Sequence, residues 1–328
     1  MQCTTRNASR AEWAELLKAS GSDYSLSQTY EFGEALAKAY SEYSYEPRIF
    51  QFDDGLTLLL PLVRSISRLK FLRCFQAMPF SLNGAPICVG GNLKSKHLTM
   101  AIESLRADSI HLNSGGFADL ADTVGGAVGG MDSIASITHM LDLAGGFDEV
   151  WTNRFTGKVR NQCRVAERKG VKVYTDSKAD DFEAYYSIYL ASTLRWGYRT
   201  PPYPPTLFRA LAQLTGMGVE LRLARVNERA VAGILLFHGR RTTFYWGGAM
   251  LKEYTEYCPT NALLRAAIAD ACERGMVRFD FGSSGELDSV RKFKESFGAE
   301  SCTYRNYIFT TLRYRFIMQA RRALAAGL

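Results

Sequence analysis

The chain has 328 residues, which is enough for about two domains with a substantial core in each. Hydrophobic residues make up 47% and charged residues 22%, proportions that are ordinary for a soluble globular protein and exclude a disordered chain. The net charge of +7, from 40 basic and 33 acidic side chains, favours anionic partners such as nucleotides, RNA or an anionic lipid surface.

The cysteines, the histidines and the N-terminus exclude further classes. The seven cysteines are scattered and form no Cys-x-x-Cys pair, and the four histidines lie far apart, so we expect no metal site and a reducing compartment. The first residues include Arg6, Arg10 and Glu12 and lack the apolar segment of a secretory signal. No run of about eighteen apolar residues occurs, so we expect no transmembrane segment. Together these features predict a cytoplasmic protein.

The first half of the chain is predicted to alternate strands and a helix. Pro47–Asp53 and Leu56–Arg64 are expected to pair, because Asp53-Asp54-Gly55 between them is a good hairpin turn. The elements expected next are a strand at Phe71–Phe75, a helix at Ser95–Arg106, a strand at Ser109–Asn113 and a strand at Ser133–Leu143. A glycine-rich loop is expected at Gly125–Asp132.

A helix that begins the second half carries a basic stripe. Arg160, Arg164 and Arg168 recur every four residues and therefore share one face. The opposite, buried stripe consists of Val159, Cys163 and Ala166. Like charges at this spacing repel one another, so we expect a phosphate or an RNA backbone to bind the stripe. The alternative is an ordinary solvated helix face, eased by Glu167.

The second half repeats the element order of the first. Its strands are expected at Val219–Val226, Ala230–His238, Thr242–Gly247 and Met276–Phe281, with a helix at Thr260–Arg274 before the last of them. The repetition predicts a mixed α/β fold with two tandem domains, residues 1–146 and 147–328. Each domain should contain a mixed, mostly antiparallel sheet flanked by helices.

Two strand ends in the second half carry candidate site residues. Tyr245 is followed by a pair of glycines, which permit close approach of a ligand to the backbone, although a core role is the alternative. Asp280 lies where a strand opens into a glycine loop, a usual ligand position in α/β folds, although it could simply cap that loop. Ser283 and Ser284 could hydrogen-bond a substrate or cap the next helix.

The helix after this loop places a lysine on its apolar side. On a helical wheel the apolar face is defined by Leu287, Val290, Phe293 and Phe297. Lys294 falls inside that arc, whereas Lys292 points the opposite way. A lysine on a buried face is costly unless it reaches a partner or ligand. The alternative is that Lys294 extends to solvent or meets a structural carboxylate.

The last segment is basic and amphipathic. Its arginines are Arg313, Arg315, Arg321 and Arg322. A solvated helix whose basic residues favour a helix C-terminus explains this composition. Peripheral contact with an anionic membrane surface is the rival interpretation.

The chain resembles the FemAB-like acyltransferases, a branch of the GNAT superfamily that includes enzymes adding amino acids to peptidoglycan precursors. Asp280-Phe281-Gly282-Ser283-Ser284 followed by Phe293-Lys294-Glu295-Ser296-Phe297-Gly298 is similar to the C-terminal signature of that family. The basic helix ending in Gly170-Val171 and the segment Ser27–Phe32 are also similar. Many relatives carry an arginine where this chain has Ser283. The repeated order of three strands, a helix and a strand is that of a GNAT fold.

The resemblance implies transfer of an acyl or aminoacyl group to an acceptor amine. It implies that Lys294 stabilises negative charge, and that Asp280 orients or deprotonates the acceptor. Arg160 and Arg164 would then hold an anionic donor. Gln28 and Tyr30 would line the acceptor cleft, and Tyr245 would lie on the strand that holds the donor. A small molecule or a cell-wall precursor is the expected acceptor. No cofactor and no covalent enzyme intermediate are expected.

The acyl donor is left open between two classes. Acetyl-CoA-dependent relatives carry a glycine-rich loop whose backbone N–H groups hold the pyrophosphate. The equivalent stretch here, Gly248–Pro259, lacks those glycines, and its proline removes one donor. Aminoacyl-tRNA is therefore the first hypothesis. An acyl-CoA or acyl-carrier-protein dependent N-acyltransferase acting on polysaccharide or lipid is the second, and a non-catalytic binding protein that keeps the fold is the third.

Overall fold

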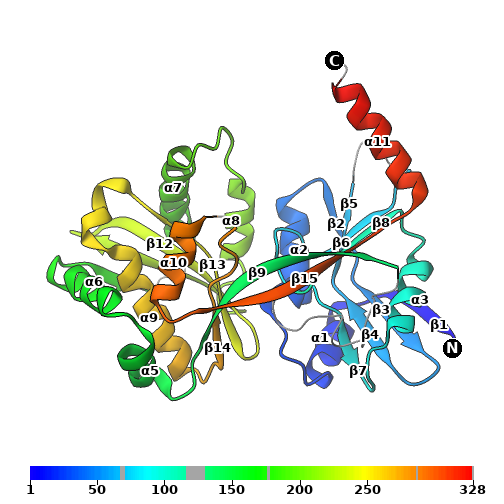
Figure 1. Ribbon diagram of the computed structural model, residues 1–328, viewed down its shortest axis with the longest axis horizontal. Coiled ribbons are helices and arrows are strands. Elements are labelled where there is room, and N and C mark those ends of the chain that lie inside the picture. Colours follow the sequence, from blue (N-terminus) through cyan, green and yellow to red (C-terminus); the bar gives the residue numbers. More distant parts are fainter. Residues whose placement is uncertain (67–70, 116–129, 176–177, 286, 327–328) are drawn as a thin grey trace. The chain divides into compact units, whose positions relative to one another are not determined.

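The chain divides into two compact units in the computed structural model, which describes residues 1–66, 71–115, 130–175, 178–285 and 287–326 (Figure 1). Unit 1 comprises residues 1–136 and 303–328, and unit 2 comprises residues 137–302. The units differ from the contiguous ranges 1–146 and 147–328, because the chain re-enters unit 1 at Thr303. Residues 125–129 of the expected loop lie outside the described residues.

Unit 2 contains an open mixed sheet with flanking helices, which confirms the expected fold class. Its strand order is β10, β11, β12, β13, β14 and β9, and of these pairs only β13–β14 is parallel. The strands are β9 (Asp132–Asp142, of which residues 137–142 belong to this unit), β10 (Lys172–Tyr174), β11 (Val219–Val226), β12 (Arg229–His238), β13 (Thr242–Met250) and β14 (Arg278–Asp280). The helices are α5 (Gly146–Glu149), α6 (Gly157–Arg168), α7 (Ala179–Arg195), α8 (Pro205–Ala212), α9 (Pro259–Glu273) and α10 (Asp288–Ser296).

Local signals in the sequence set the ends of the helices near the site. The Thr156 hydroxyl accepts a hydrogen bond from the Val159 backbone N–H and so caps the start of α6. Pro259 is the first residue of α9, a position that needs no N–H donor. Gly275 ends α9 with a φ of 70°, which favours glycine. The chain is thereby turned directly into the strand that carries Asp280.

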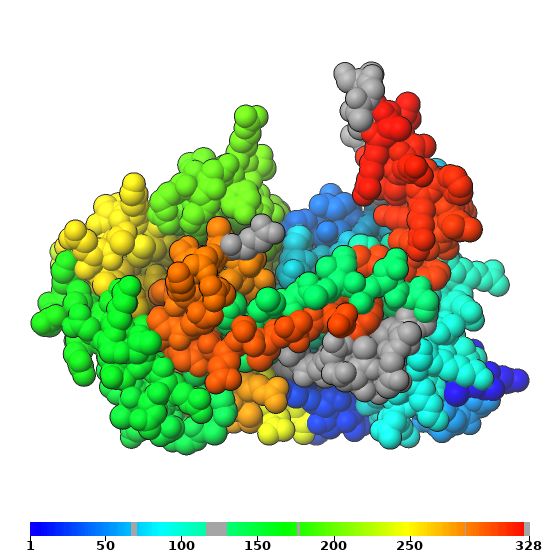
Figure 2. Space-filling view, viewed as in Figure 1, coloured from blue at the N-terminus to red at the C-terminus, as the bar shows by residue number. Residues whose placement is uncertain are grey.

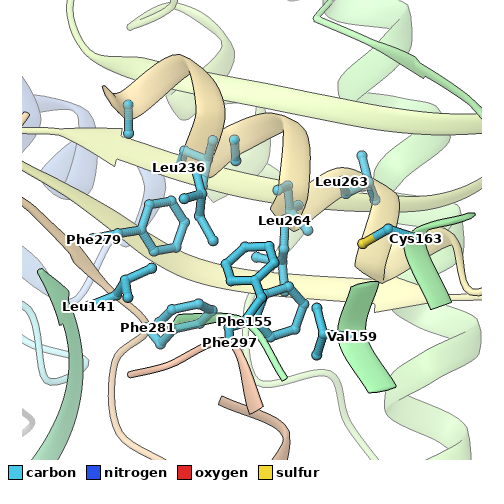
Figure 3. Packing of buried hydrophobic residues seen from close by; sticks show 14 of the residues in the cluster. Leu141, Phe155, Val159, Cys163, Leu236, Leu263, Leu264, Phe279, Phe281 and Phe297 are labelled. Carbon is cyan, nitrogen blue, oxygen red and sulfur yellow. The ribbon is translucent and has the colours of Figure 1, made fainter. Parts of the chain in front are cut away.

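The core of unit 2 lies between the sheet and the helices α6 and α9 (Figure 3). Leu236 of β12, Leu264 of α9 and Phe279 of β14 meet there. Phe281, just after β14, and Phe297, just after α10, are also buried and pack with their rings 5.7 Å apart. Phe279 and Phe281 therefore both face the core, and their burial fixes the backbone on both sides of Asp280.

Unit 1 contains two groups of strands. The strands are β1 (Cys3–Asn7), β2 (Tyr43–Tyr45), β3 (Arg48–Phe52), β4 (Thr57–Leu60), β5 (Leu62–Ser65), β6 (Cys74–Ala77), β7 (Ile87–Val89), β8 (Ser109–Asn113) and β15 (Glu300–Thr310, of which residues 303–310 belong to this unit). The helices are α1 (Arg10–Ala19), α2 (Tyr30–Ala39), α3 (Ser95–Leu105) and α11 (Leu312–Ala326). One group has the order β1, β3, β4, β7, and in the other β2, β5, β6, β8 and β15 are neighbours in that order.

A proline divides one strand that the sequence was expected to form continuously. Leu56–Arg64 is not a single strand, because β4 ends at Leu60 and β5 begins at Leu62, with Pro61 between them. β4 pairs with β3 and β7, whereas β5 pairs with β2 and β6. Proline cannot donate to a strand ladder, so the pairing changes partner at this residue. None of the helices in the described ranges is long and apolar enough to cross a membrane.

Candidate active site

The parallel strands β13 and β14 separate shortly after they begin. They pair only from Thr242 to Phe244 of β13, opposite Arg278 to Asp280 of β14. β13 then continues to Met250 beside β12 alone, with a register shift that leaves Trp246 as an extra residue. Among the described residues, β13 therefore has no strand partner beyond Phe244 on the side where β14 ends, and such an opening between parallel strands is where α/β folds place ligands.

Asp280 lies at the end of β14, beside this opening, and its carboxyl group is buried. Its side chain is 3% exposed. Its Oδ1 accepts hydrogen bonds from the Thr138 hydroxyl at 2.5 Å and from the Gly282 backbone N–H at 2.8 Å. Burial raises the pKa of Asp280 to about 6, although both hydrogen bonds and the charge of Lys294 act in the opposite direction. A carboxyl group with such a pKa can accept and release a proton near neutral pH.

Lys294 on α10 is buried, and its ammonium group faces the loop after Asp280. Its Nζ donates to the backbone oxygens of Gly282 at 2.9 Å and Ser283 at 2.7 Å. Burial lowers the pKa of Lys294 to about 8, opposed by the negative charge of Asp280. An ammonium group has three donors, so two serve the loop and one is available to a ligand. The expected position of Lys294 on the buried side of the helix is confirmed.

The apolar face of α10 is narrower than the helical wheel indicates. Leu287 is 63% exposed, whereas Phe297 is fully buried and Phe293 packs at the border of the core. Leu287 precedes the first turn of α10, so it does not share the face that the helix presents to the core. The buried contacts of α10 therefore lie in its second half, beside Lys294.

Two residues of β9 complete this site and were not identified from the sequence. Thr138 donates to Asp280, and His139 Nδ1 lies 3.3 Å from the hydroxyl of the buried Ser284. Burial lowers the pKa of His139. Its Nε2 is buried and has no hydrogen-bond partner among the described residues. Because β9 and β14 are far apart in the sequence and meet only through strand pairing, no local motif marks these two residues.

The two serines of the loop have different surroundings. Ser284 is buried beside His139, whereas Ser283 is exposed and its hydroxyl accepts from the Gly285 backbone N–H at 3.1 Å. Neither serine caps α10, which begins after Leu287 without a side-chain cap. The capping alternative is therefore wrong. The Ser283 backbone oxygen, rather than its hydroxyl, makes the contact with Lys294.

The segment between β13 and α9 does not form an open glycine loop. Residues Lys252–Tyr257 form a 3₁₀ helix, and Cys258 adopts a left-handed conformation with a φ of 51°. α9 then begins at Pro259, which has no N–H to offer to a ligand. The first turn of α9 is consequently a poorer pyrophosphate site than a glycine-rich helix start.

Part of the chain that includes this site is similar to a known protein family. Residues 153–295, which include Asp280 and Lys294, match the model described as an acetyltransferase (GNAT) domain. We name residues 153–295 the GNAT domain after this match. No curated protein sequence matches the chain.

Solved structures with a similar fold extend over the whole chain. FemX has a TM-score of 0.72 at 13% identity and covers 96% of this chain and 99% of its own. The C-terminal domain of a putative lysylphosphatidylglycerol synthetase from Agrobacterium fabrum has a TM-score of 0.58 at 12% identity, with coverages of 96% and 98%. A tandem GNAT protein from the clavulanic acid biosynthesis pathway has a TM-score of 0.55 at 11% identity, with coverages of 94% and 98%. These likenesses confirm a fold shared with FemX and with a tandem GNAT protein.

Two arginines of the basic stripe have different surroundings. The Arg160 guanidinium donates to the backbone oxygens of Trp151, Thr152 and Phe155, at 3.1, 2.9 and 2.6 Å. It therefore caps the end of the preceding helical turn. Arg164, one turn further on, is exposed. The expected buried stripe on the opposite face of α6 is confirmed.

Tyr245, Gln28 and Tyr30 are the remaining residues that the sequence suggested for substrate binding. Tyr245 packs edge-on against Phe281 in the core of the GNAT domain, with ring centroids 6.2 Å apart, and burial raises its pKa to about 12. Gln28, in unit 1, is buried and donates to the Ala85 backbone oxygen at 2.8 Å. Tyr30, also in unit 1, is half-buried and packs edge-on against Tyr45.

The described residues contain no group of three or more His, Cys, Asp or Glu side chains arranged to hold a metal ion. Five polar side chains lie together beside the end of β14. They are Asp280, Lys294, Thr138, His139 and Ser284. All five belong to unit 2. This combination can supply a proton acceptor, a fixed positive charge and hydroxyl groups to one reacting centre.

Proposed function

We propose that the GNAT domain transfers an aminoacyl group from aminoacyl-tRNA to an amine of a cytoplasmic peptidoglycan precursor or a similar small acceptor. The observation that carries this proposal is the buried pair Asp280 and Lys294 beside the opening between β13 and β14. With pKa values of about 6 and about 8, both groups are charged between these two pH values. A base and a cation are then present together in one low-dielectric site.

In this mechanism the acceptor nitrogen attacks the ester carbonyl of the donor. A C–N bond forms, and the carbonyl oxygen becomes an oxyanion that accepts a hydrogen bond from Lys294 Nζ. Asp280 takes the proton that the nitrogen loses. The C–O bond to the ribose then breaks, and the same proton goes to the leaving hydroxyl. Asp280 therefore ends each cycle as a carboxylate, and Lys294 remains protonated throughout.

The backbone contacts of Lys294 support its role as a fixed charge. Its two bonds to the Gly282 and Ser283 carbonyls hold the ammonium before substrate binds, so little reorganisation is needed during reaction. The Thr138 hydroxyl similarly fixes one oxygen of Asp280 and leaves the other for the acceptor. These contacts support the roles that the resemblance to FemAB-like enzymes implies for Lys294 and Asp280.

The choice of donor rests on the segment before α9. Its 3₁₀ helix and Pro259 offer few free N–H groups for a pyrophosphate, which disfavours CoA. An exposed Arg164 on α6 offers a charge for an RNA phosphate. The description of the matched family as acetyltransferase favours a second candidate, an acyl-CoA or acyl-carrier-protein dependent N-acyltransferase.

A two-arm transfer assay tests the proposal. Purified protein is incubated with a lysine-containing peptidoglycan precursor peptide and either a labelled mixture of aminoacyl-tRNAs or a set of acyl-CoAs. We expect label in the peptide from the tRNA arm and no thiol release in the CoA arm. Thiol release with no tRNA-dependent product would replace the leading candidate with the second. Equal transfer by wild type and Lys294→Met would reject the catalytic site in both cases.

A further inference from the structure

The C-terminal helix α11 exposes a row of large apolar side chains. Leu312, Phe316 and Leu324 are 72%, 71% and 70% exposed. At ~100° per residue these three side chains fall within one arc of ~120° on the helix surface. Isolated apolar residues are common on protein surfaces, but a row along one helix indicates an interaction face. Figure 1 shows α11 extending away from the strands of unit 1 that precede it.

The opposite side of α11 fixes the helix to unit 1. Tyr314 and Met318 line a cavity of about 190 Å³ together with Phe75 of β6 and Ser109 of β8. The Thr311 hydroxyl accepts from the Tyr314 backbone N–H and so caps the start of the helix. The side of α11 that carries Tyr314 and Met318 therefore faces β6 and β8, and the apolar row is turned away from the cavity.

Arginines border the apolar row on both sides. By helical spacing Arg315 and Arg322 lie along one border. Arg321 lies beyond the other border, where it also lines the cavity, and Arg313 falls within the arc itself. α11 contains no acidic residue, and its arginines are exposed. Asp132 lies 3.6 Å from Arg315, but its side chain is itself largely exposed and can neutralise only part of this charge. The face therefore combines apolar side chains with a positive rim.

Phe71, from another part of unit 1, adds an exposed apolar side chain beside α11. It is 56% exposed, and the Arg313 guanidinium lies 5.4 Å from its ring centroid. Arg313 also donates to the Phe71 backbone oxygen at 3.3 Å. Phe71 and the first turn of α11 are consequently held next to each other. We name the set Leu312, Phe316, Leu324 and Phe71, with its flanking arginines, the α11 face.

We infer that the α11 face docks unit 1 on an anionic phospholipid surface. Leucine and phenylalanine side chains enter the boundary between headgroups and acyl chains, while the arginines contact anionic headgroups. A second copy of the chain fits less well, because a symmetric contact would bring the same arginine borders together. An RNA would use the charges but would leave the aliphatic side chains in water.

Vesicle flotation with the full chain tests this inference. The probes are vesicles of phosphatidylcholine alone and vesicles of equal parts phosphatidylcholine and phosphatidylglycerol. We expect wild type to float only with the anionic vesicles, and binding to weaken as salt increases. Leu312→Gln/Phe316→Gln and Arg315→Glu/Arg322→Glu should each reduce the partition coefficient ~10-fold or more. All these side chains are exposed, so circular dichroism melting should be unchanged.

Matched controls come from unit 2. Met217→Gln removes a side chain that is 58% exposed, and Arg209→Glu/Arg229→Glu reverses two exposed charges, so both should bind as wild type does. The inference is overturned if wild type does not bind anionic vesicles at low salt, or if both α11 variants bind as well as wild type. It is also overturned if the chain sediments as a dimer that Leu312→Gln/Phe316→Gln dissociates. The assay measures no acyl transfer, so its outcome is independent of the proposed function.

Discussion

In unit 1, β6 and β8 have the same relation that β13 and β14 have in unit 2. Each is a parallel pair whose two strands are connected through a helix, α3 in unit 1 and α9 in unit 2. In unit 2 the pair separates after three residues, and β13 continues beside β12 but no longer beside β14. In unit 1 the pairing runs over the whole of β6, from Cys74 to Ala77, and the chain then turns sharply.

The segment after β6 fills the place that is open in unit 2. Gly84 lies so close to the end of β6 that a Cβ atom there would be 1.9 Å from the Ala77 backbone oxygen. The Gly84 backbone N–H donates to the Asn113 backbone oxygen at the end of β8, at 2.8 Å. The Asn113 side chain donates to the Met78 backbone oxygen. The end of β8 is thus occupied by the protein's own backbone, whereas the end of β14 carries Asp280 and Lys294.

This difference shows how one topology can serve two purposes. A parallel pair that stays closed satisfies its backbone groups internally and contributes stability. A pair that separates leaves backbone donors and a buried charge pair for a ligand. Catalysis by this protein is therefore expected to depend on unit 2, and substitutions at the matching places of the two units should have different consequences.

The largest effect is expected from Lys294→Met. Methionine keeps most of the buried stem but removes the ammonium, so we expect kcat to fall ~10²- to 10³-fold. Two backbone oxygens also lose their donor, which should lower the free energy of unfolding by about 1–3 kcal/mol. The matched control is Lys292→Ala, whose side chain is 69% exposed and should affect neither quantity. Equal activity of the two variants would show that the charge is not catalytic.

The pH dependence of the reaction should change when Thr138 is replaced. Activity requires Asp280 as a carboxylate and Lys294 as a cation, so kcat should rise through pH about 6 and fall through pH about 8. The Thr138 hydroxyl lowers the pKa of Asp280. Thr138→Val removes this donor, and the acidic limb should move up by ~1–2 pH units.

Thr138→Ser keeps a hydroxyl at the same atom and serves as the control. Its acidic limb should coincide with that of wild type in pH–rate profiles. If Thr138→Val and Thr138→Ser have acidic limbs at the same pH, Asp280 is not the group whose titration sets the acidic limb. The basic limb, which reports Lys294, should be unchanged in both variants because Thr138 contacts Asp280 and not Lys294.

Gly84→Ala tests the closed pair of unit 1. The added methyl group would overlap the Ala77 backbone, so we expect a loss of about 1–3 kcal/mol in the free energy of unfolding. Gly91→Ala is the matched control, because its Cβ would meet the Leu56 side chain at an ordinary 3.5 Å. Urea denaturation measures both. A Gly84→Ala variant as stable as wild type would contradict the view that this segment is tightly packed on β6.

The smallest effect is expected from Arg164→Ala. Loss of one phosphate contact should reduce the slope of log affinity against log salt for tRNA by about one, with no change in melting temperature. Arg160→Ala should behave differently, because three backbone oxygens lose their donor and stability should fall. Filter binding at several salt concentrations, with melting curves for both variants, separates the two roles. An unchanged slope for Arg164→Ala would exclude Arg164 from the donor site.

Local patterns in the sequence predicted many of the helices and strands of unit 2 but not its long-range contacts. The strands and helix from Val219 to Arg274 follow from alternation, helix caps and Gly275, all of which act within a few residues. The buried Lys294 follows from helical periodicity. Thr138 and His139 could not be found in this way, because only the pairing of β9 with β14 brings them to Asp280.

Two errors have identifiable physical causes. The division of Leu56–Arg64 was marked by Pro61, which the nearly continuous run of apolar residues around it concealed. The basic stripe on α6 was interpreted through its charges alone. Guanidinium groups also bind backbone oxygens, and such acceptors leave no trace in a sequence pattern, so the capping role of Arg160 was missed.

The return of the chain to unit 1 at Thr303 affects the order in which the protein can fold during synthesis. β8 needs β15 as a neighbour, since Ser109–Asn113 pairs with Asn306–Thr310. Domains generally fold as they emerge from the ribosome, the N-terminal one first. Here the order is reversed, because every residue of unit 2 is translated before unit 1 receives its last strand. The catalytic unit can therefore be complete while the N-terminal part of the chain still has an unpaired strand edge, and a premature stop near residue 302 would leave that edge exposed to aggregation.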